Sequence, residues 1–151
     1  MSYIFEHEIR EDTPADVELF GKKSVRLPLS DSMRLMLDFT YSTIVQFPKY
    51  EKHGGLAAEI RANTWLLQEL ILTARQYQKF KPTESRAKAQ IARLERIVVQ
   101  HELLKFKVRA AVDRKYINLE SYGKWARHLV GIGQQIGGWL RHLRESKGTA
   151  L

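Results

Sequence analysis

Cysteine is absent from this chain of 151 residues. Without it there is no disulfide, no thiolate metal site and no cysteine nucleophile. Long apolar runs are missing as well, since no stretch approaches the ~18 uninterrupted apolar residues of a membrane span. The N-terminus is too acidic for a signal or transit peptide, with Glu6, Glu8, Glu11 and Asp12 near its start. The chain is therefore expected to remain in the cytoplasm, without contact with a membrane.

Motifs of catalysis and of metal or nucleotide binding are also lacking. The histidines show neither HExxH spacing nor a Glu-x-x-His pair; they are His7, His53, His101, His128 and His142. A P-loop and a serine nucleophile elbow are missing too. We therefore predict no catalytic residue, no cofactor and no metal site. His101 lies close to an apolar stripe and is interpreted as a core or interface residue.

A convincing strand pattern is absent, and most of the chain after residue 28 instead has apolar residues at spacings of three and four. This periodicity predicts four helices. The first is expected to begin at Ser30 or Asp31, either of which can accept hydrogen bonds from the free amides of a first turn. Pro48 should end it.

Similar sequence signals mark the boundaries of the remaining helices. The second follows Gly55, runs to about Gln78 and has an apolar face that extends to Tyr77. Thr83 is expected to cap a third helix of roughly thirty residues. A turn at residues 116–118 leads to the fourth.

Short connections between four helices favour an all-α, antiparallel up-down-up-down four-helix bundle. The length of the chain suits one domain. We expect an extended acidic arm over residues 1–28, the bundle over residues 29–146, and a frayed tail over residues 147–151.

Charge is distributed unevenly along this pattern. Residues 1–60 carry 7 Lys/Arg against 10 Asp/Glu, a net charge of −3, whereas residues 61–151 carry 18 against 7, a net charge of +11. A solvated helix face needs some charge, but a surplus of this size attracts polyanions, of which nucleic acid is the abundant one in the cytoplasm. No motif for base recognition is present, so contacts to phosphates with little sequence specificity are expected.

The candidate nucleic-acid-binding residues are the cations of the second and third helices and of the turn that follows. They are Arg75, Lys79, Arg86, Lys88, Arg93, Arg96, Lys107, Arg109, Arg114 and Lys115.

The fourth helix is unusual in its glycines, each of which costs about 1 kcal/mol relative to alanine inside a helix. Their spacing does not match the GxGxxG fingerprint and they follow a helix, so a dinucleotide site is not expected. Close approach of another helix, within the bundle or from a second subunit, explains them better. The predicted packing residues, which favour a homo-oligomer, are Gly133, Gly137, Gly138 and Trp139.

Several short segments resemble a superfamily of small bacterial four-helix bundles. They are FPKYEKHG at 47–54, LAAEIR at 56–61, DRKYI at 113–117, IG at 132–133 and IGGWL at 136–140. One branch of the superfamily comprises proteins encoded in intervening sequences of ribosomal RNA genes, and the other comprises the accessory variability determinant (Avd) proteins of diversity-generating retroelements. The chain lacks the Ile-Ala-Glu-Gly run typical of the ribosomal branch and has LLQELILTA at 66–74. It is therefore similar to the Avd branch.

The resemblance covers about residues 31–146 and leaves the first thirty residues uncovered. It implies a pentameric barrel of bundles that associates with the element's reverse transcriptase and template RNA. Such a protein is required for mutagenic copying into a target gene and performs no chemistry itself.

The leading hypothesis is a non-enzymatic, oligomeric accessory that binds RNA or cDNA and reverse transcriptase. One alternative is an oligomeric scaffold whose positive charge meets an acidic protein partner, and another is a bundle of the ribosomal intervening-sequence type. An enzyme or metal carrier is the least favoured alternative.

Overall fold

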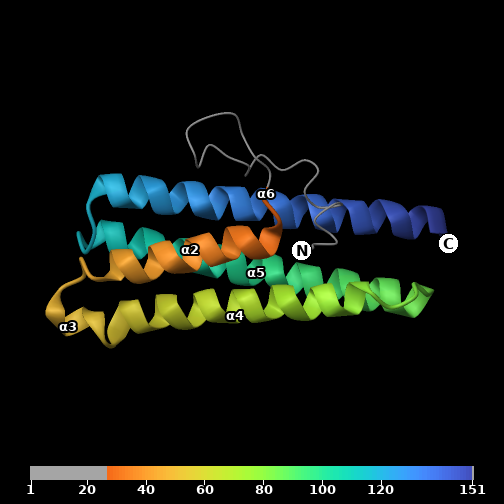
Figure 1. Cartoon of the computed structure of the whole chain (residues 1–151), viewed down its shortest axis with the longest axis horizontal. Coiled ribbons are helices and arrows are strands. Elements are labelled where there is room, and N and C mark those ends of the chain that lie inside the picture. Colours follow the sequence, from red (N-terminus) through yellow and green to blue (C-terminus); the bar gives the residue numbers. More distant parts are fainter. Residues whose placement is uncertain (1–26, 151) are drawn as a thin grey trace.

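The computed structural model describes residues 27–150 of the chain, and their side chains as far as residue 146. Four long helices form its body (Figure 1). They are α2 (Leu29–Ile44), α4 (Gly55–Gln78), α5 (Glu84–Asp113) and α6 (Leu119–Ala150), and a short helix α3 (Lys49–Lys52) precedes α4. No strand occurs within residues 27–150, which confirms the all-α prediction.

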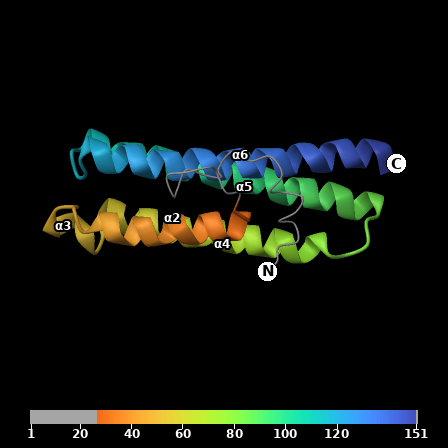
Figure 2. The same ribbon diagram turned by 45° about the horizontal axis from the view of Figure 1, so that its top comes forward.

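Each long helix packs against two others. α5 lies between α4 and α6, and α2 contacts both α6 and α4 (Figures 1 and 2). In both views the chain reverses direction between consecutive long helices. Because α2 has only 16 residues, the last part of α4, the first part of α5 and the last part of α6 extend beyond it.

The predicted apolar faces supply the core. Met33 and Met36 of α2, Ile60 and Leu67 of α4, and Trp125 of α6 are fully buried. Burial of large side chains of this kind contributes roughly 1.5–3 kcal/mol each, and this stabilisation holds the amphipathic helices together. α5 contributes a row with the same spacing: Leu94, Ile97, His101, Leu104 and Val108.

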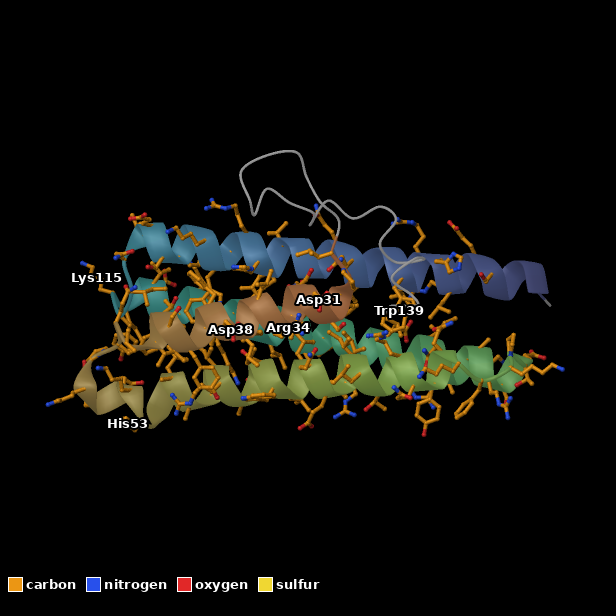
Figure 3. The ribbon with its side chains drawn as sticks, viewed as in Figure 1. Asp31, Arg34, Asp38, His53, Lys115 and Trp139 are labelled. Carbon is orange, nitrogen blue, oxygen red and sulfur yellow. The ribbon has the colours of Figure 1, made fainter. Side chains whose placement is uncertain are left out.

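The start of α2 differs from the prediction. The helix begins at Leu29 with Pro28 at the N-cap, and no side chain caps it. Ser30 accepts a hydrogen bond from Arg75, and Asp31 forms an ion pair with Arg34 at 2.9 Å (Figure 3). The prediction of a Ser30 or Asp31 cap is wrong because the helix begins at Leu29, which places both residues inside its first turn, where the Pro28 carbonyl accepts the Asp31 and Ser32 N–H groups.

The start of α4 depends on a carboxylate and a glycine. Glu51 Oε1 accepts the Leu56 N–H at 2.7 Å and so satisfies one free amide of the first turn. Gly55 has φ +54°, and a Cβ there would lie 2.3 Å from the same oxygen. Glycine is therefore required at this position by both backbone and space.

α5 begins as predicted, because the Thr83 side chain accepts the Arg86 N–H at 3.1 Å. It ends in a turn where Lys115 has φ 63° and the Tyr116 N–H donates to the Ala111 carbonyl. This is the hydrogen bond of a Schellman motif, with lysine in the position that usually holds glycine.

Two predicted segments lie at or beyond the described residues. The backbone of α6 is helical to Ala150, four residues past the expected end of the bundle. The acidic arm expected over residues 1–28 falls outside the described residues except for Leu27 and Pro28.

Candidate nucleic-acid interface

The ten candidate cations occupy two ends of the bundle. Six of them come from the end of α4 and the first part of α5, and the other four lie near the α5–α6 turn (Figure 1). About 40 Å of helix separates Arg86 from Arg114. The ten candidates therefore form two basic regions on one subunit.

The end formed by α4 and α5 has the larger excess of charge. Residues 75–96 contain seven Lys/Arg and two Asp/Glu. Both acids are engaged at the surface, Glu84 with Lys88 at 3.8 Å and Glu95 with Arg144 at 2.7 Å. Among the described side chains, five of these cations form no ion pair: Lys79, Lys81, Arg86, Arg93 and Arg96.

Two aromatic rings lie among these cations. Tyr77 is 43% exposed and Phe80 is 55% exposed, with ring centroids 5.6 Å apart and ring planes at 80°. The Arg93 guanidinium lies 3.6 Å from the centre of the Tyr77 ring, and the Arg86 guanidinium lies 5.8 Å from that of Phe80. Both distances are within the range of cation–π attraction. We define the α4–α5 cluster as Tyr77, Lys79, Phe80, Lys81, Arg86 and Arg93.

The expectation that Tyr77 belongs to the buried face of α4 is wrong. The buried row of this helix ends at Ala74, because α2 does not extend this far along the bundle. Tyr77 instead packs against Arg93 and Phe80 at the surface.

Hydrogen bonds beneath the cluster tie three helices together. The Gln90 Nε2 donates to the Ala74 carbonyl at 2.7 Å and to the Gln78 Oε1 at 2.9 Å. The Trp139 indole N–H of α6 donates to the same Gln78 oxygen at 3.1 Å (Figure 3). Gln90 is buried, so its amide is satisfied only by these protein groups and by Arg93, which donates to its Oε1. The network holds the end of α4, which carries Tyr77, in place.

The cations at the opposite end are more fully paired. Lys107, whose side chain is only 24% exposed, contacts Glu59 at 3.1 Å and donates to Asn63. Arg109 pairs with Asp113 at 3.0 Å, and this hydrogen bond raises the pKa of its guanidinium. Lys115 is exposed at the α5–α6 turn (Figure 3). A paired cation must give up its acid before it can neutralise a phosphate, so this end is the weaker candidate.

Four further candidate cations lie at the edges of the two basic regions. Arg75 donates to Ser30 at 3.1 Å and so joins α4 to the start of α2. Lys88 and Arg96 are exposed on α5, one and three turns into the helix. Arg114 donates to the Ala110 carbonyl at 3.4 Å at the end of α5.

The predicted packing residues of α6 differ in their surroundings. A Cβ on Gly133 would lie 2.6 Å from the His101 ring, so this glycine admits α5 closely. Among the described residues, and apart from the neighbouring backbone of α6, no atom lies within 4 Å of a Cβ built on Gly137, and only Arg141, at 3.8 Å, lies near one on Gly138. Trp139 is buried inside the bundle.

His101 is buried between α5 and α6, as its position on the apolar stripe predicts. Its Nε2 lies 2.7 Å from the Leu129 carbonyl, so that nitrogen carries the proton and donates it. Burial lowers the pKa of His101, while the carbonyl partner acts in the opposite direction. Burial also lowers the pKa of His128 on α6.

Other kinds of site are not found in the part of the chain that the structure describes. No group of three or more His, Asp or Glu side chains there could hold a metal ion. None of the described helices is long and apolar enough to cross a membrane.

Comparison with known families adds to this geometry. The family model described as bAvd-like matches residues 28–143, which span α2, α3, α4, α5 and most of α6. The chain belongs to the bAvd-like family. This match confirms the resemblance to the Avd branch and supports an accessory protein of the Avd type. No curated protein and no solved structure gives a match.

The charge pattern of this bAvd-like chain did not reveal Tyr77 and Phe80. Periodicity assigned Tyr77 to the core, and no helical pattern covers Phe80. A signal was nevertheless present, because Phe80 stands between two lysines in the connection before Pro82. An aromatic residue flanked by cations in an exposed connection is typical of single-strand binding surfaces.

Proposed function

We propose that this bAvd-like protein is a non-enzymatic accessory of a diversity-generating retroelement. In this role an antiparallel up-down-up-down bundle binds template RNA or cDNA and the element's reverse transcriptase, and so supports mutagenic retrohoming. The protein acts in the cytoplasm and needs no cofactor. The observation that carries the nucleic-acid part is the α4–α5 cluster, where exposed cations without acidic partners gather at one end of the molecule.

Phosphate binding at this end follows from electrostatics. Each phosphate that a Lys or Arg neutralises releases condensed counterions, and so contributes about 0.7 to 0.9 to the slope of log K against log salt. Cations already paired within the protein contribute less, because their acids compete with the phosphate. The α4–α5 end should therefore supply most of the salt dependence.

The test removes three unpaired cations and compares them with three paired ones. Lys79, Arg86 and Arg96 are changed to Gln in one variant, and Lys105, Arg109 and Lys124 in the control. We expect the first variant to lower the salt slope for RNA by about 2 and the control to lower it by less than 1. Equal losses in the two variants would overturn the assignment of the surface.

Self-association is a second part of the proposal. The exposed apolar residues Val99, Leu103 and Phe106 share one face of α5, at spacings of four and three. Phe106 is 72% exposed, which is unfavourable in an isolated subunit. We propose that this stripe is covered by a second copy of the chain in a homo-oligomer, a pentamer by the Avd resemblance.

A scaffold for an acidic protein is the second candidate, because the same unpaired cations would attract carboxylates. Competition by poly-glutamate separates the two functions. RNA binding that survives an equal charge concentration of poly-glutamate supports the nucleic-acid function, and complete displacement supports the scaffold.

A further inference from the structure

The α4–α5 cluster holds exposed aromatic rings as well as cations. We infer that it binds single-stranded nucleic acid, with bases stacked on Phe80 and on the Tyr77–Arg93 pair and with phosphates held by the flanking lysines. This inference rests on the proposed function and narrows its ligand to strands whose bases are unpaired.

The exposure of the rings carries the first step. Phe80 is 55% exposed and lies just beyond the end of α4. Aromatic side chains at a basic surface offer flat apolar faces on which any base can stack, without regard to sequence. The lack of a base-reading motif in the chain agrees with this mode of binding.

The angle between the two rings favours a single strand over a duplex as the ligand. The planes of Tyr77 and Phe80 meet at 80°, so two bases stacked on them would be nearly perpendicular to each other. A single strand can bend to present bases in this way, whereas the interior bases of a duplex remain parallel and stacked on one another. The geometry therefore favours unpaired bases.

The cations are interleaved with the rings. The Arg93 guanidinium lies 3.6 Å from the centre of the Tyr77 ring, and guanidinium groups can themselves take part in stacking with bases. Lys79 and Lys81 flank Phe80 in the chain, so two cations belong to residues next to the ring on which a base would stack. No acid of the described side chains pairs with these two lysines.

The end of α4 next to Tyr77 is held in place before any ligand binds. Gln90, Gln78 and Trp139 fasten the end of α4 to α5 and α6 beneath Tyr77. A surface that is already ordered loses little conformational entropy on binding, so stacking contributes more of its free energy to affinity.

The experiment compares a thymidylate dodecamer with an abasic dodecamer of the same backbone at one salt concentration. Both carry the same phosphates, so their affinity ratio measures stacking alone. We expect the full chain to prefer the thymidylate strand by about tenfold or more. Phe80→Leu, which keeps an apolar side chain but no ring, removes one of the two stacking surfaces and should lower the ratio severalfold while leaving the salt slope unchanged.

Tyr50→Leu is the matched control, because Tyr50 is an exposed aromatic residue beside a lysine at the other end of the bundle. Its ratio should equal that of the unaltered chain. Equal binding of the two strands by the unaltered chain would overturn stacking, while salt-dependent binding of both would leave the proposed function intact. Absence of binding to either strand and to RNA at low salt would remove the proposed function together with this inference.

Discussion

Gly133 and His101 lie against each other where α5 crosses α6. The imidazole occupies the space that any larger residue at position 133 would need, and its proton satisfies the Leu129 carbonyl. A glycine in mid-helix loses about 1 kcal/mol relative to alanine, and here the close approach of a buried polar ring offsets that loss. A contact of this kind is sensitive to the addition of a single carbon.

Gly133→Ala should therefore lower the free energy of unfolding by about 1–2 kcal/mol, since overpacking of about 1–3 kcal/mol exceeds the gain in helix propensity. The control is Gly137→Ala, where open space in the subunit allows a gain of up to about 1 kcal/mol. Urea unfolding of both variants measures the difference. A Gly133→Ala variant as stable as the parent would contradict the assigned packing.

The pH dependence of stability also belongs to the residue scale. Burial lowers the pKa of His101 in the folded state below its ordinary value of 6.5, and nearby Lys105 adds to this lowering. The unfolded chain then binds a proton at a pH where the folded chain does not. Stability contributed by neutral His101 is complete above about pH 6.5 and is lost as the pH falls toward the folded-state pKa.

We expect the free energy of unfolding to fall between pH 7.5 and pH 5.5, and His101→Gln to reduce this fall. Burial lowers the pKa of His128 as well, so a variant with both histidines replaced should have the flattest profile. Urea titrations at several pH values provide the measurement. A profile that keeps its slope in the double variant would show that other groups control it.

At the scale of elements, the junction of α4 with α5 depends on one buried amide. Gln90 supplies hydrogen bonds to the Ala74 carbonyl and to Gln78, at the level of the bundle where α2 begins. An unsatisfied buried polar group costs about 1–3 kcal/mol. The end of α4 is thus held by polar contacts where the core has fewer helices.

Gln90→Leu should lower the free energy of unfolding by about 1–3 kcal/mol. Gln134→Leu, the same change at an exposed position of α6, should alter it by less than about 0.5 kcal/mol. Hydrogen exchange of the last turn of α4 should also become faster in the first variant. Unchanged exchange there would show that Gln90 does not hold the junction.

At the scale of the whole molecule, the two basic ends and the apolar stripe of α5 bear on how copies of the chain associate. One subunit separates its basic regions by about 40 Å of helix. Several copies joined through the stripe would multiply the α4–α5 clusters available to one strand, which raises affinity through effective concentration.

Phe106→Lys should therefore reduce the mass of the assembly in light scattering, because a charge replaces an apolar side chain within the proposed interface. Leu72→Lys, at an exposed apolar position of α4 outside the stripe, should leave the mass unchanged. The Phe106 variant should also bind long RNA more weakly than the parent, yet bind a strand of one site length equally well. An unaltered mass would exclude the stripe as the interface.

The helices, their buried faces and the excess of positive charge after residue 60 can be predicted from the amino-acid sequence alone. Helix periodicity and a cap such as Thr83 depend on residues within a few turns, and net charge is a sum over residues, so all three can be obtained without the fold. The start of α2 was predicted wrongly because Ser30 and Asp31 match the pattern of a cap, whereas the helix begins one residue before them, directly after Pro28.

Which charges remain unpaired and which rings reach the surface depends on how the helices pack. Lys107 meets Glu59 across the α4–α5 interface, and Arg144 meets Glu95 across the α5–α6 interface, at separations in sequence that no local pattern encodes. Tyr77 lies outside the core because α2 starts level with Arg75, which bonds to Ser30. The short length of α2 therefore leaves an aromatic face of α4 exposed. Burial depends on which helices lie nearby, and the periodicity of one helix carries no information about its neighbours.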